Sequence, residues 1–140
     1  MALIADSGAV YGLYDRRDRH HPALRAAIER ERGPILIPTA ILGEIDYLLR
    51  TKLGIRAELD FLDDILAGAF TLEPLTAADL ARARELIEQF RSLDLGLADA
   101  AVIATADRLR VRRILTVDER DFRAVCSADG TPFVLLPADA

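Results

Sequence analysis

The stretch Leu97–Leu109, LADAAVIATADRL, predicts the central helix of the domain. Its Ala, Val, Ile and Leu residues make it apolar almost all the way round, which is typical of a helix buried in the middle of a fold. Asp99 stands near its first turn, where the helix dipole and free backbone N–H groups favour negative charge. Asp99 is therefore either a cap of a core helix or a functional carboxylate, and the other acidic residues favour the second interpretation.

On either side of this helix, strand patterns alternate with helix patterns. Short apolar strands are predicted at residues 2–5, 35–37, 70–75, 114–117 and 133–136. Helices are predicted at residues 8–14, 22–32, 39–52, 55–66, 77–90, 97–109 and 120–125. The alternation predicts an α/β domain with a short, mostly parallel sheet covered on both faces. Ligands of such sheets bind beyond the carboxyl ends of the strands.

Local signals predict where several helices begin and end. Gly33 is expected to end the helix that Pro22 opens, and Thr39 is expected to cap the next helix. Thr76 and Asp79 have the spacing of a capping box. The segment Ile55–Leu66 has leucines at helical spacing, which face either the core or a partner.

Composition limits the classes of protein to which the chain can belong. Its 140 residues predict one domain over residues 1–140, and 51% hydrophobic and 29% charged residues predict a globular protein. No apolar run approaches the ~18 residues of a membrane span, and Asp6 comes too early for a signal peptide. We therefore expect a soluble cytoplasmic protein without a membrane partner. The single Cys126 excludes an internal disulfide and a Cys-based zinc site.

The net charge of −5 argues against a nonspecific nucleic-acid coat, which would be basic. It does not exclude an enzyme that acts on nucleic acid, because metal-dependent nucleases concentrate carboxylates at their site. Of the 18 basic residues 17 are Arg, the side chain suited to bidentate phosphate contacts. Any binding of a polyanion must therefore come from a local group of arginines and not from the overall charge.

Four acidic residues are predicted to converge at the carboxyl edge of the sheet. Asp6 follows the first strand, Asp118 follows the fourth, and Asp99 begins a helix that leaves from the same edge. Glu44 flanks the buried stripe of its helix. Carboxylates about 5 Å apart repel by about 3 kcal/mol at an effective dielectric near 20, so such a cluster calls for a counter-cation. Oxygen ligands without Cys or His suit Mg²⁺ or Mn²⁺, ions that promote phosphodiester cleavage.

These residues carry a resemblance to a known family. Asp6-Ser7 after the first strand, Glu44 within TAILGEIDYLL, LADAAVIATA around Asp99, and ILTVDERDF at residues 114–122 resemble the PIN domain. More narrowly, the chain is similar to the VapC-type toxins of toxin–antitoxin pairs. The resemblance implies a three-layer α/β/α sandwich, an endoribonuclease (a hydrolase) that uses Mg²⁺ or Mn²⁺, and a homodimer. It also implies an RNA substrate and a VapB-like antitoxin whose C-terminal segment covers the site.

The resemblance assigns Asp6, Glu44, Asp99 and Asp118 as the catalytic and metal-binding acids. Ser7 and Thr116 match hydroxyl positions near the site, and Asp121 can share the role of the fourth acid with Asp118. Asp94, five residues before Asp99, is instead expected to be a solvated loop acid. The sequence leaves open which of Asp118 and Asp121 is the fourth acid and whether one or two ions bind.

Several alternatives stay open at this stage. An aspartyl-phosphate enzyme with Asp6 as nucleophile is discounted, because the only lysine, Lys52, lies elsewhere in the sequence. A housekeeping PIN nuclease in RNA processing and a non-catalytic RNA- or protein-binding PIN module are the other two. If an antitoxin binds, its apolar residues are expected in the grooves between the helices at residues 39–52 and 55–66. Arg16, Arg17, Arg19, Arg112 and Arg113 are candidates for RNA contact, with none assigned.

Overall fold

Five short strands form one parallel sheet at the centre of the computed structural model, which describes residues 1–140. The strands are β1 (Leu3–Ala5), β2 (Ile35–Pro38), β3 (Thr71–Glu73), β4 (Arg113–Leu115) and β5 (Val134–Leu136). Their order is β3-β2-β1-β4-β5, and every neighbouring pair is parallel. The predicted parallel sheet is therefore confirmed, with β1 in the middle.

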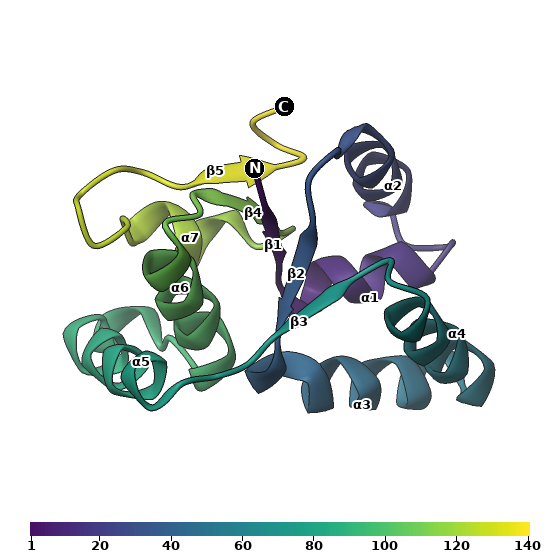
Figure 1. Ribbon diagram of the computed structural model, residues 1–140, viewed down its shortest axis with the longest axis horizontal. Helices are drawn as coiled ribbons and strands as arrows, with labels where there is room; N and C mark the ends of the chain where they lie inside the picture. The colour runs from purple at the N-terminus through teal and green to yellow at the C-terminus, as the bar shows by residue number, and fades with distance from the viewer.

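Helices cover both faces of the sheet, so the predicted three-layer α/β/α sandwich is also confirmed (Figure 1). On one side lie α1 (Ser7–Tyr14), α2 (His21–Arg30), α3 (Leu42–Leu53) and α4 (Ile55–Leu66). On the other lie α5 (Ala77–Gln89), α6 (Leu97–Leu109) and α7 (Glu119–Ala124). Right-handed crossovers explain this division, because the chain reverses its direction across the sheet between β3 and β4.

Helix α6 is buried as its composition predicts, and its bounds are those expected from the sequence. Every residue from 100 to 106 is buried, and the helix packs against α5, β1 and β2. Such burial fixes the position and direction of its first turn, which carries Asp99. No helix in the structure combines the length and apolar character that crossing a membrane requires.

Two predicted helix signals have other roles in the structure. Thr39 does not cap a helix: its hydroxyl accepts the Leu75 N–H at 3.0 Å, and residues 39–41 form a 3₁₀ turn before α3 begins. Gly33 does not end α2, which stops at Arg30. A Cβ at position 33 would lie 1.6 Å from the carbonyl oxygen of Met1, so this glycine allows close approach of the chain start. The capping box of Thr76 and Asp79 is confirmed, with both hydrogen bonds at 3.0 Å.

Helix α4 has the predicted bounds but turns its leucines outward. Phe61 faces the core, where its ring packs against those of Tyr14 and Phe70. The exposed apolar side chains of α4, which we call the α4 stripe, follow at helical spacing and are Ile55, Leu59, Leu62 and Leu66. Leu66 is 85% exposed, so the core-facing interpretation of these leucines is wrong.

Candidate metal centre

The candidate site lies at the carboxyl ends of β1 and β4, where the order in which the chain adds strands to the sheet reverses. Strand β1 pairs with β2 on one side and with β4 on the other, so the chain leaves their carboxyl ends toward opposite faces. Asp6 follows β1 directly, and Thr116 and Asp118 follow β4. This is the topological switch point at which open α/β sheets bind their ligands.

Asp6 is a buried carboxylate held by two hydrogen bonds. It caps α1, where its Oδ1 accepts the Ala9 N–H at 2.8 Å. Its Oδ2 accepts the Thr116 hydroxyl at 2.5 Å, which joins the ends of β1 and β4. The Thr116 hydroxyl in turn accepts the Asp118 N–H at 2.9 Å. Beside Asp6, the buried Ser7 Oγ has no hydrogen-bond partner in the protein.

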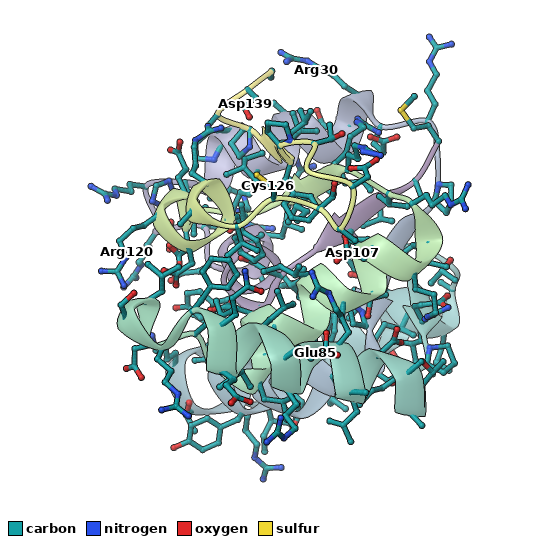
Figure 2. All side chains as sticks on the ribbon, turned by 90° about the vertical axis from the view of Figure 1, so that its left-hand side faces the viewer. Arg30, Glu85, Asp107, Arg120, Cys126 and Asp139 are labelled. Carbon is teal, nitrogen blue, oxygen red and sulfur yellow. The ribbon has the colours of Figure 1, made fainter.

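Three further carboxylates meet next to this pair of strand ends. Asp99, Asp118 and Asp121 each have one oxygen within 4.8 Å of the other two, and we call these three residues the acid triad. Asp99 lies in the first turn of α6 but caps no backbone group, and the Asp118 side chain caps nothing at α7. In Figure 2, Arg120, which precedes Asp121 of the triad, extends from the left-hand edge of the molecule, and Asp107, near the end of α6, lies to the right of the centre.

Burial and mutual repulsion raise the pKa of two of these acids. Burial raises the pKa of Asp6 to about 7, with additions from the charges of Asp99 and Asp118, against the lowering effect of its hydrogen bonds to Thr116 and Ala9. Burial also raises the pKa of Asp99 to about 6, with additions from Asp118, Asp121 and Glu44. The acids therefore share one electrostatic environment that disfavours their ionised forms.

The structure brings most of the predicted acidic residues together but leaves Glu44 outside the triad. Asp6, Asp99 and Asp118 lie together, and Asp121 joins Asp118 in the triad. Glu44 lies outside the triad, exposed in the first turn of α3, although its charge acts on Asp99. The Thr116–Asp6 hydrogen bond is not predictable from the sequence, because residues 110 positions apart give no local signal.

The donor set fits a hard divalent cation. All its ligand atoms are carboxylate oxygens, which Mg²⁺ and Mn²⁺ prefer over the Cys and His ligands of zinc. A bound cation would also offset the repulsion that raises the pKa values of Asp6 and Asp99. The partnerless Ser7 hydroxyl is suited to a water molecule or a phosphate oxygen at the same place.

Comparison with known proteins decides the family. The sequence model of the PIN domain matches residues 3–128. The chain belongs to the PIN-domain family. Its PIN domain is similar to Ribonuclease VapC26 of Mycobacterium tuberculosis strain H37Rv, with 32% identity over 135 residues that cover 96% of this chain and 100% of the relative. PIN domains generally depend on divalent metal ions, in keeping with the acidic cluster.

Solved structures share the fold of this PIN domain. The crystal structure of Mycobacterium tuberculosis VapC20, a sarcin-ricin loop cleaving toxin, matches with a TM-score of 0.75 at 19% identity, over 80% of this chain and 86% of that one. A toxin–antitoxin complex from Klebsiella pneumoniae matches with a TM-score of 0.70 at 19% identity, over 91% and 94% of the two chains.

We predict that metal-free Asp99→Asn unfolds at a higher temperature than the wild type at pH 7.5. A pKa raised from 3.8 to about 6 means that folded Asp99 holds its proton more tightly than unfolded Asp99. Stability from this group is present at low pH and is lost as pH rises from about 4 to 6, to an extent that solvent screening reduces because Asp99 is partly exposed. Thermal unfolding with and without Mn²⁺ measures this, and Mn²⁺ should stabilise the wild type far more than the variant.

The matched control is Asp94→Asn, at an exposed loop position outside the triad. Its unfolding temperature and its response to Mn²⁺ should equal those of the wild type. A wild-type protein that Mn²⁺ does not stabilise at pH 7.5 would contradict the prediction.

Proposed function

We propose that this protein is an endoribonuclease that uses Mg²⁺ or Mn²⁺ and is the toxin of a VapBC-like toxin–antitoxin pair. The proposal covers residues 1–140 as one nuclease domain that acts as a homodimer in the cytoplasm. The likeness to Ribonuclease VapC26 over nearly the whole of both chains supports an RNA-cleaving activity. The likeness to a solved toxin–antitoxin complex is in keeping with the proposed partner.

The acid triad is the observation that carries the proposed activity. Three carboxylate oxygens within 4.8 Å of one another form a site with strong negative charge at the carboxyl edge of the sheet. A structural role would leave such charges paired with cations, but Asp99 and Asp118 form no ion pair with any Arg or Lys. This arrangement favours a catalytic ion site.

The roles of the residues follow from their positions. Asp99, Asp118 and Asp121 would hold the ion, with Asp6 behind them fixed by Thr116 and the Ala9 N–H. Either Asp118 or Asp121 can supply the fourth acid that the family resemblance assigns. When bound, Mg²⁺ or Mn²⁺ supplies activation of a water molecule and neutralises charge on the scissile phosphate.

Glu44 is suited to move the proton in this reaction. Its exposed carboxylate has no hydrogen-bond or ion-pair partner, and its charge acts on Asp99. The oxygen of water forms a bond with phosphorus, and its proton passes to Glu44. The bond between phosphorus and the leaving ribose oxygen breaks, and that oxygen takes a proton from solvent.

We predict that Asp99→Asn lowers RNA cleavage at least 100-fold, because it removes one charged ligand at the centre of the triad. The assay is cleavage of total cellular RNA by pure protein with Mg²⁺, Mn²⁺ or EDTA. Asp94→Asn, the matched control, should cleave like the wild type, and EDTA should stop both. Full cleavage by Asp99→Asn, or wild-type cleavage in EDTA, would show that the triad does not hold a catalytic ion.

For the antitoxin, we propose the α4 stripe as part of the binding surface. Its four apolar side chains follow at spacings of four, three and four residues, which matches the apolar face of an amphipathic partner helix. Tyr47 of α3, the helix that packs against α4, is also 67% exposed. Four large exposed side chains on one helix face indicate an interaction site rather than ordinary surface.

We predict that Leu59→Asp weakens binding of the antitoxin at least tenfold and leaves RNA cleavage unchanged, because a charge interrupts the stripe at a residue outside the acid triad. The partner to test is the product of a short reading frame next to the gene, measured by titration calorimetry. Leu80→Asp on α5, similarly exposed at 49%, is the control. A gene without such a neighbour would favour a housekeeping nuclease, and unchanged binding by Leu59→Asp would exclude the stripe.

A further inference from the structure

A pocket borders Thr116, the residue that hydrogen-bonds Asp6 of the metal centre. Its volume is about 300 Å³, at the lower end of pockets that hold small ligands. His20, Glu119 and the Pro137–Ala138 turn form its walls, with Thr116 and Val117 between them; we call it the His20 pocket. Because Thr116 also hydrogen-bonds Asp6, one residue separates this pocket from the proposed reaction site.

Hydrogen bonds hold the polar residues of the His20 pocket in place, and one carboxylate oxygen among them has no hydrogen-bond partner. The His20 N–H donates to Asp18 Oδ1 at 2.7 Å, and its Nε2 accepts from Arg19 Nε at 3.2 Å. Glu119 Oε1 accepts two hydrogen bonds from Arg123, at 3.0 and 3.3 Å, while its Oε2 accepts none. The pocket therefore offers an aromatic ring and one free carboxylate oxygen.

The loop that carries His20 also carries three arginines without an ion-pair partner. Arg16, Arg17 and Arg19 form no ion pair with any carboxylate of the chain. Arg112 and Arg113, in contrast, are engaged by Asp129 and Glu31. Guanidinium groups without an ion-pair partner are available to phosphate oxygens, and Arg19 adjoins the pocket through its hydrogen bond to His20.

We propose that the His20 pocket binds one nucleobase of the RNA strand next to the scissile phosphate and sets part of the sequence preference. The inference rests on the proposed ribonuclease function. The His20 ring stacks on the base, as aromatic side chains do with unpaired RNA bases, and Arg19 contacts the adjoining phosphate. The free oxygen of Glu119 accepts a hydrogen bond from an exocyclic amino group, so adenine, cytosine and guanine are favoured over uracil.

The test begins with the cut sites that the wild type makes in total RNA. Short oligonucleotides of one such site, varied at the two bases on each side of the cut, give kcat/KM for every base at every position. Wild type should disfavour uracil about tenfold at one of the four positions. Glu119→Gln should lose that discrimination at that position alone, because the amide offers a donor as well as an acceptor. His20→Ala should lower kcat/KM about tenfold, the size of one stacking contact.

The control is Glu29→Gln, which removes the same charge from an exposed i,i+4 pair with Arg25 on α2 and should keep the wild-type profile. Titration with Mn²⁺ should give equal binding for all variants, which shows that the metal centre is intact. Wild-type discrimination retained by Glu119→Gln at all four positions would overturn the nucleobase pocket. A wild type that binds Mn²⁺ and cuts no RNA would instead overturn the proposed function.

Discussion

Repulsion between carboxylates is the constraint on which this structure depends. Two unit charges 4.8 Å apart, the upper limit within the triad, repel by about 3 kcal/mol at an effective dielectric near 20. The fold holds them together because residues 100–106 of α6 are buried, so the helix cannot move Asp99 away. The hydrogen bond from Thr116 to Asp6 fixes Asp6 beside the triad, at the ends of β1 and β4. Carboxylates that the fold holds together despite their mutual repulsion form a site that favours binding of a cation.

The same arrangement explains how an acidic protein can act on a polyanion. The net charge of −5 repels RNA at long range, so attraction must come from the bound ion and from local arginines. The loop before α2 carries Arg16, Arg17 and Arg19, which form no ion pair, and Arg19 hydrogen-bonds His20 of the pocket that borders Thr116. Thr116 belongs to both regions: its hydroxyl donates a hydrogen bond to Asp6, and the residue borders the His20 pocket.

The sequence predicts much of this fold, and the failures have physical reasons. The bounds of Leu97–Leu109 follow from apolar composition, and the meeting of Asp6 with Asp118 follows from parallel strands sharing one carboxyl edge. For Ile55–Leu66 the period predicts an amphipathic helix, but apolar spacing does not say whether the chain itself or a partner covers the stripe. Asp121 enters the triad only because α7 turns it back toward Asp118, which spacing alone does not specify.

Diffraction from crystals soaked in Mn²⁺, collected for its anomalous signal, tests the central claim most directly. Ion binding by the acid triad predicts a Mn²⁺ peak within about 2.5 Å of carboxylate oxygens from Asp99, Asp118 and Asp121, beside Asp6. A map without a peak among these carboxylates, at a Mn²⁺ concentration that supports RNA cleavage, would contradict it.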